Sequence, residues 1–135
     1  MKKIFAVLLL SLFNLLFSAC ASNQPDNKEE IPQIIDVKIH TEPETGIEPG
    51  KPVTIEAWVT QGSEYVDDAD EVEFEIWNKT RPDDKHELIK GKLQGKGVYS
   101  IQKTFDAPGS YYVVSHVTAR GMHNMPRKEL TVTQK

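Results

Sequence analysis

Polar and apolar residues alternate with a period of two through most of the chain from Ile34 onward. Such alternation is typical of a β-strand with one buried face. The pattern recurs in seven segments that are separated by turn-forming residues rich in glycine, proline and aspartate. The strands that it predicts are residues 34–40, 53–59, 71–76, 86–90, 98–105, 111–119 and 128–132.

No segment of this part of the chain shows a helical period. Short strands with turn signals between them predict an all-β fold, an immunoglobulin-like antiparallel β-sandwich of about seven strands. The phrase at residues 108–113, PGSYYV, resembles the start of strand F in such sandwiches, where a tyrosine points inward. If Tyr111 is that tyrosine, the alternation turns Val113 inward and His116 outward.

Residues 1–19 have the composition of a secretory signal peptide. Lys2 and Lys3 precede an apolar run at residues 4–17, and small residues follow it. A membrane-spanning helix needs about 20 apolar residues, more than this run provides. The sequence therefore favours a signal peptide over a transmembrane anchor.

Cys20 is the only cysteine of the chain. The segment at residues 16–20, LFSAC, resembles the lipobox of bacterial lipoproteins, in which the cysteine is acylated and becomes the mature N-terminus. Acyl chains such as palmitate stabilise membrane attachment by about 0.8 kcal/mol per buried methylene. The other interpretation is an ordinary signal peptide that ends at a cysteine. We expect a lipoprotein, anchored in the cell membrane on its extracytoplasmic face.

The rest of the chain divides into a tether and a domain. Residues 20–32 comprise the lipidated cysteine and a polar, flexible tether, and residues 33–135 form the β-sandwich. Removal of the signal peptide leaves 14 basic and 20 acidic side chains, a formal charge of −6. Nucleic acid is therefore excluded as an expected partner.

Soft and borderline donor atoms gather in one segment near the C-terminus. His116, Met122, His123 and Met125 lie within ten residues, and the only other methionine, Met1, belongs to the predicted signal peptide. Imidazole nitrogens together with thioether sulfurs suit copper, Cu(I) especially. A hairpin after the strand that carries His116 would bring His123 and one methionine back towards it.

His86 opens the strand at residues 86–90 and reaches the same end of the sandwich if that strand flanks the same sheet. The predicted metal ligands are His86, His116, Met122, His123 and Met125. Each has an alternative, because many histidines bind nothing and methionines fill gaps in cores. We expect no ligand role for His40, which stands alone in the first strand. The acidic residues at 67–75 fit the solvated face of a strand better than a calcium site.

Catalysis finds little support, so we expect no enzyme. No serine lies in a Gly-x-Ser-x-Gly context, and Cys20 is assigned to the anchor. The glycines at residues 95–97 lack the context of a phosphate-binding loop. An alternative function is a metal-free protein-interaction module at the membrane surface, which would use Trp58 or Trp77 on the outward registers of their strands.

Four segments resemble the YtkA-like domain family, which is also grouped with FixH-like proteins. They are residues 68–77 (DADEVEFEIW), 97–100 (GVYS), 109–113 (GSYYV) and 116–123 (HVTARGMH), and the resemblance spans roughly residues 33–133. It implies a small immunoglobulin-like domain, exported or membrane-tethered, that is associated with copper handling and with assembly of haem-copper respiratory oxidases. FixH-like members have a transmembrane helix, whereas this chain has the lipobox-like segment.

By position, His116, Met122 and His123 fall on the phrase that resembles the metal-binding end of the family, with His86 and Met125 as companions. The sequence and the resemblance together predict a lipid-anchored protein that binds copper, with Cu(I) favoured. We expect it to buffer the metal or to deliver it to a protein partner, with respiratory oxidase assembly as one destination.

Overall fold

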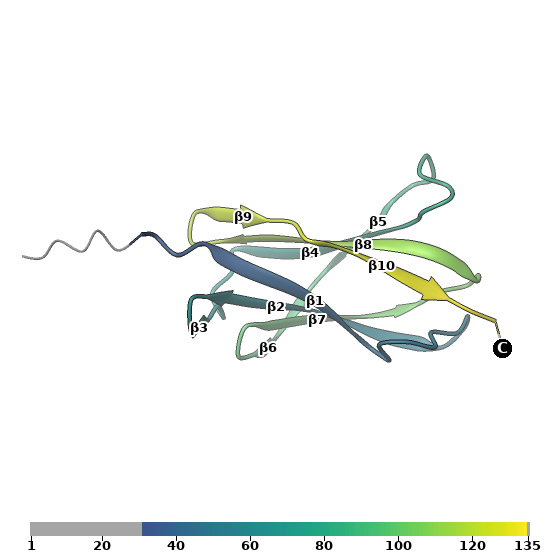
Figure 1. The fold of residues 1–135 in the computed structure, drawn as a ribbon, viewed down its shortest axis with the longest axis horizontal. Coiled ribbons are helices and arrows are strands. Elements are labelled where there is room, and N and C mark those ends of the chain that lie inside the picture. Colours follow the sequence, from purple (N-terminus) through teal and green to yellow (C-terminus); the bar gives the residue numbers. More distant parts are fainter. Residues whose placement is uncertain (1–30, 135) are drawn as a thin grey trace, which may run out of the picture. The chain divides into compact units, whose positions relative to one another are not determined.

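The alternating segments pair into two antiparallel sheets, which lie one over the other in Figure 1. The structure, a computed structural model, describes residues 31–134, and these contain strands and no helix. The predicted all-β sandwich is therefore confirmed. The strands are β1 (Ile35–Glu42), β2 (Pro52–Gln61), β3 (Glu64–Tyr65), β4 (Glu71–Asn78), β5 (Glu87–Lys90), β6 (Lys92–Gly95), β7 (Val98–Thr104), β8 (Gly109–Ala119), β9 (Met122–Asn124) and β10 (Arg127–Val132).

The strand order is that of an immunoglobulin-like sandwich. The first sheet runs β1-β2-β7-β6, and β3 also pairs with β2. The second sheet runs β10-β8-β4-β5, and β9 also pairs with β8. These orders correspond to strands A-B-E-D and to strands G-F-C with an added edge strand. The chain passes from the edge of the second sheet to the edge of the first at Gly91, between β5 and β6.

The seven predicted strands correspond to β1, β2, β4, β5, β7, β8 and β10. Three short strands, β3, β6 and β9, were not predicted. Two or three residues, as in β3 and β9, are too few to show an alternation, and the four residues of β6 include only one large apolar side chain, Leu93. The sequence predicts a loop at residues 120–126, but these residues contain β9, which pairs with β8 in the second sheet.

Both sheets contribute one face to a single hydrophobic core. Phe74, Phe105 and Val117 are fully buried in it, together with isoleucines and valines from the strands of both sheets. Tyr111 packs against this core, and its hydroxyl donates a hydrogen bond of 2.9 Å to the carbonyl oxygen of Ala107. This contact is the tyrosine corner of immunoglobulin-like folds.

The predicted register of β8 is confirmed. Val113, Ser115 and Val117 are buried between the sheets, and His116 is half-buried on the outer face of the second sheet. The position of Tyr111 therefore correctly predicts that His116 points outward, because side chains alternate along a strand.

The turn between β6 and β7 depends on a glycine. Lys96 and Gly97 are its two central residues, and their φ angles are 54° and 71°. Positive φ at both positions is typical of a type I′ hairpin turn. A Cβ on Gly97 would lie 2.2 Å from the carbonyl oxygen of Val59 on β2, so the turn is also pressed against a neighbouring strand.

Residues 32–135 make up one compact unit. The predicted signal peptide, Cys20 and nearly all of the tether lie outside the described residues. No helix in residues 31–134 is long and apolar enough to cross a membrane.

Candidate functional site

His116 and His123 lie on the outer face of the second sheet. The pairs Asn124–Val117 (β9 with β8) and Arg127–Val114 (β10 with β8) share one register. Met125, between the two strands, therefore falls opposite His116 on β8. The same hairpin places His123 opposite Thr118, one step along the same face. The predicted return of the chain towards His116 is thus observed.

His116 and His123 are close enough to share a ligand. Their ring centres are 6.1 Å apart, and the planes are inclined by 37°. Metal–imidazole bonds of about 2.0–2.1 Å put each ring centre about 3.2 Å from the ion, so two rings on one ion have centres roughly 5 to 6.4 Å apart. The observed separation lies in that interval.

The carboxylate of Glu75 lies between His116 and His86. Its Oε2 is 2.7 Å from His116 Nε2, and its Oε1 is 2.5 Å from His86 Nδ1. The hydrogen bond from His86, and then that from His116, holds the pKa of Glu75 below its usual value. An ionised carboxylate only accepts hydrogen bonds, so both facing ring nitrogens carry the proton.

His86 uses both of its ring nitrogens within the protein. Nδ1 faces Glu75, and Nε2 lies 3.2 Å from the carbonyl oxygen of Pro82, so both partners are acceptors. The hydrogen bond to Glu75 raises the pKa of His86, because it favours the doubly protonated ring. The strand that follows His86, β5, does flank the second sheet, as the prediction required, and His86 lies on the side of Glu75 opposite to His116.

The two candidate methionines point to different sides of the sheet. Met122 lies opposite Ala119, is partly buried and packs against the core. Met125 is 55% exposed. Because side chains alternate along the hairpin, His123 and Met125 share the outer face while Met122 faces inward. The alternative of a packing role therefore describes Met122, and only Met125 is brought to the face that carries the histidines.

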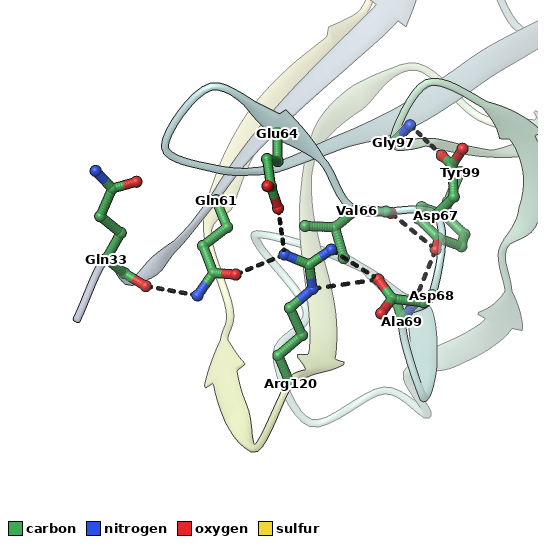
Figure 2. A network of polar contacts seen from close by, with 10 residues as sticks. All are labelled: Gln33, Gln61, Glu64, Val66, Asp67, Asp68, Ala69, Gly97, Tyr99 and Arg120. Carbon is green, nitrogen blue, oxygen red and sulfur yellow. Dashed lines mark hydrogen bonds and ion pairs between the residues drawn. The ribbon is translucent and has the colours of Figure 1, made fainter.

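Residues that the sequence did not single out anchor the hairpin (Figure 2). Arg120 and Gly121 form its two-residue turn, with φ angles of 53° and 74°. The guanidinium of Arg120 donates to Gln61 Oε1 at 2.6 Å, to Glu64 Oε2 at 3.2 Å and to Asp68 Oδ1 at 3.2 Å. This network, which we call the Arg120 clamp, joins the hairpin that carries His123 to the end of β2 and to the segment between β2 and β4.

The acidic segment between β3 and β4 is also used internally. Asp67 Oδ1 accepts a hydrogen bond from the backbone N–H of Gly97 at 2.5 Å. The hydroxyl of Tyr99 donates to the carbonyl oxygen of Val66 at 3.0 Å and accepts from the N–H of Ala69 at 3.1 Å. Figure 2 shows these contacts beside the Arg120 clamp. Part of the acidic run therefore secures the connection and is not simply a solvated strand face.

The remaining aromatic candidates differ in exposure. Trp77 is half-buried, because its indole stacks on the ring of His86 and lies near Tyr112. Its side chain is therefore less exposed than the sequence predicts. Trp58 is 46% exposed on the first sheet, where it lies beside His40 and donates to Glu56. His40 is on β1 and is not part of the group on the second sheet.

Within residues 31–134, no three side chains drawn from His, Cys, Asp and Glu are arranged to hold a metal ion. A site at His116 and His123 therefore needs the thioether of Met125 as its third donor. Two nitrogens and a thioether form a donor set that suits Cu(I). In the described part of the chain, Nδ1 of His116 and Nε2 of His123 have no protein hydrogen-bond partner.

Solved structures share the sandwich at low sequence identity. An engineered protein superposes with a TM-score of 0.54 at 14% identity, over 73% of this chain and 20% of that one. An endo-β-1,4-mannanase from Thermotoga petrophila gives 0.56 at 14% identity, over 81% and 22%. The chain spans about a fifth of the length of these two proteins, and the likeness concerns the fold alone.

The soluble domain of PmoD from Methylocystis sp. ATCC 49242 (Rockwell) superposes with a TM-score of 0.48 at 13% identity, over 75% of this chain and 92% of that one. No curated protein sequence is significantly similar to this chain.

The sequence does match a family model, that of the YtkA-like family, over residues 29–116. This is more than half of the chain. The match includes Glu75 and His86 and ends at His116, so β9 and β10 lie beyond it. The matched range is shorter than residues 33–133, over which the sequence resembles the family. It includes the segments at residues 68–77, 97–100 and 109–113 in full. The chain belongs to the YtkA-like family.

Proposed function

We propose that this YtkA-like domain binds copper, with Cu(I) favoured, through His116, His123 and Met125. The observation that carries the proposal is the 6.1 Å separation of the two imidazole rings on the face that also presents Met125. The position of Met125 opposite His116 adds a thioether, the donor that favours Cu(I) over harder cations. His86 and Met122 are left out of the ligand set, because one is bonded at both nitrogens and the other packs against the core.

The position of the site suits buffering or delivery of the metal better than catalysis. Met125 is largely exposed, and the site lies on the outer face of a sheet. A partner protein can reach such a site and exchange ligands with it, as a delivery protein requires. We propose no enzymatic activity.

A competition titration with a Cu(I) chelator tests the proposal. Residues 32–135 form one compact unit with its own core, so the domain can be tested alone. We expect one Cu(I) per domain, and loss of this binding in the His123→Ala/Met125→Ala variant. His40→Ala, which removes a histidine from the other sheet, is the matched control. Equal binding by the double variant and the wild type would refute the proposed site.

Thermal unfolding supplies an independent measurement. A ligand that binds only the folded state stabilises it by about 2.7 kcal/mol when its concentration is about 100 times Kd. Cu(I) should therefore raise the unfolding temperature of the wild type and of His40→Ala, and leave that of the double variant unchanged.

We also propose that Cys20 carries a lipid anchor that holds the domain on the extracytoplasmic side of the membrane. The lipobox-like segment and the absence of other cysteines support this. Metabolic labelling with a tagged fatty acid tests it in cells. We expect the full-length chain to be labelled and membrane-bound, and Cys20→Ser to lose the label. Labelling of the serine variant would show that Cys20 is not the anchor.

Exposed aromatic side chains favour a second candidate, a metal-free protein-interaction module. Trp58 is 46% exposed and Tyr65 is 59% exposed, both on the first sheet. In this case Trp58→Ala would abolish function in the cell, and His123→Ala/Met125→Ala would preserve it. Copper binding predicts the reverse result for the same two variants.

A further inference from the structure

The imidazole of His116 is hydrogen-bonded to the carboxylate of Glu75. Its Nε2 donates to Glu75 Oε2 over 2.7 Å, and in the described part of the chain Nδ1 has no protein partner. Histidines that bind a metal through one nitrogen commonly donate the other N–H to a carboxylate, which fixes the tautomer and the orientation of the ring. The pair formed by Glu75 and His116 has this arrangement before any metal is bound.

Glu75 is itself fixed by a second histidine. Its other oxygen accepts from His86 Nδ1 over 2.5 Å. His86 is held by the carbonyl oxygen of Pro82 at its other nitrogen and by stacking on Trp77. A carboxylate that is bonded at both oxygens, at one of them to a ring that is itself fixed, has little freedom to rotate. Such outer contacts hold a metal ligand in its binding geometry.

We propose that Glu75 is a positioning residue of the copper site, which assigns Nδ1 of His116 as the metal-binding atom. His86 supports Glu75 and is not a ligand. The inference rests on the proposed copper site, and it adds two residues to that site. The sequence predicts Glu75 only as part of the solvated face of a strand, and it predicts His86 as a ligand.

The neighbouring glutamate provides a matched control. Glu73 lies directly opposite His116 in the register of β4 and β8, and it projects on the same face as Glu75. In the described part of the chain it makes no hydrogen bond to His116. Glu73→Gln therefore removes a nearby negative charge and leaves the contact with His116 in place. Glu75→Gln removes the charge and replaces one of the two acceptor oxygens with a donor, so the side chain can no longer accept from His86 and His116 through separate oxygens.

The first experiment measures the Cu(I) affinity of these variants by chelator competition. Loss of a carboxylate that orients a metal ligand typically lowers metal affinity by about 10- to 100-fold. We expect a loss of this size in Glu75→Gln and almost none in Glu73→Gln, with partial recovery in Glu75→Asp. Equal losses in the two glutamine variants would show that charge alone acts, and would overturn the positioning role.

The second experiment identifies the binding atom and needs no substitution. In the ¹⁵N-labelled domain loaded with Ag(I), a diamagnetic soft ion used here as the probe, the silver–nitrogen coupling reports which ring nitrogen binds. We expect coupling at Nδ1 of His116 and a retained Nε2–H proton. Coupling at Nε2 of His116, or at either nitrogen of His86, would overturn the inference while copper binding itself stands.

The third experiment tests the support from His86. His86→Phe keeps a ring that can stack on Trp77 and removes both nitrogens. We expect unchanged stoichiometry and a smaller loss of Cu(I) affinity than in His116→Ala. A loss as large as that of His116→Ala would make His86 a ligand and overturn the inference. If the wild type binds neither Cu(I) nor Ag(I), the proposed function fails, and the inference fails with it.

Discussion

The imidazole of His86 lies flat against the indole of Trp77, with ring centres 4.4 Å apart and planes inclined by 7°. The same ring donates to Glu75 and to a backbone carbonyl, so three separate contacts fix it. Because the pair His86–Glu75 links β4 to the segment that leads into β5, its state of ionisation affects the stability of this edge of the second sheet.

The pair should give stability a definite pH dependence. The pKa of His86 is raised above 6.5 by its bond to Glu75, so its contribution is complete below pH 6.5 and is lost as the pH rises through the raised value. The pKa of Glu75 is lowered from 4.5 by His86 first and His116 second, so its contribution is lost as the pH falls through the lowered value. The pair therefore stabilises the fold most between pH 4.5 and pH 6.5.

Thermal unfolding of the wild type and of His86→Phe, followed from about pH 3 to about pH 9, measures this effect. The difference between the two unfolding temperatures should be largest inside the window and should shrink on both sides. A difference that is constant over the whole range would contradict the prediction.

Met122 and Met125 should separate stability from metal binding. Met122 packs against the core, so Met122→Ala should destabilise the domain by about 1–2 kcal/mol, less than a fully buried methionine. It should leave the Cu(I) affinity unchanged. Met125→Ala should barely change stability and should lower the Cu(I) affinity by roughly tenfold or more, about 1.4 kcal/mol. Denaturant unfolding and chelator competition on both variants check this, and the opposite assignment would reverse both results.

Removal of the Arg120 clamp should loosen the hairpin that carries His123. Arg120→Asn retains a residue that tolerates positive φ and loses the guanidinium with its three acceptors. We expect amide hydrogen exchange in β9 to become faster, on the order of tenfold, because the hairpin opens locally. Exchange in β4 should stay as it is, and a uniform change across the domain would point to global destabilisation instead.

Two glycines at the turn between β6 and β7, Gly97 within it and Gly95 just before it, form a matched pair for stability. Gly95 and Gly97 both have positive φ, of 99° and 71°. A Cβ on Gly95 meets nothing within 4 Å, whereas one on Gly97 would lie 2.2 Å from a backbone oxygen of β2. Gly95→Ala should cost about 1–2 kcal/mol of conformational strain, and Gly97→Ala about 3 kcal/mol or more. Equal costs in chemical denaturation would argue against the close approach.

The sequence predicts the sandwich and the outward direction of His116, because both depend on local alternation and on one tyrosine phrase. It does not separate Met122 from Met125. That distinction requires the two-residue turn at Arg120 and Gly121, which makes β9 a strand whose alternate side chains face opposite sides. A loop, as expected from the sequence, would have left both methionines available.

Glu75 and Arg120 also lie beyond sequence reasoning, for a different reason. Glu75 is one of several alternating glutamates on β4, and the pairing of β4 with β8 places Glu73 directly opposite His116. Only the side-chain hydrogen bond shows that Glu75 is the glutamate that contacts His116. Arg120 reaches Asp68, a residue 52 positions earlier, across the gap between two loops. Contacts between such distant residues leave no local pattern in a single sequence.

The crossing of the chain at Gly91 has a consequence for crowded conditions. Exposed sheet edges are templates on which a second copy can add a strand and begin to aggregate. On this side of the sandwich the edge strands β5 and β6 are only four residues each, the register of β6 shifts between Leu93 and Gly95, and Lys90 and Lys92 flank the crossing. Short, irregular and charged edges resist such pairing. Copies of this protein held at high local density should therefore not pair through β5 and β6.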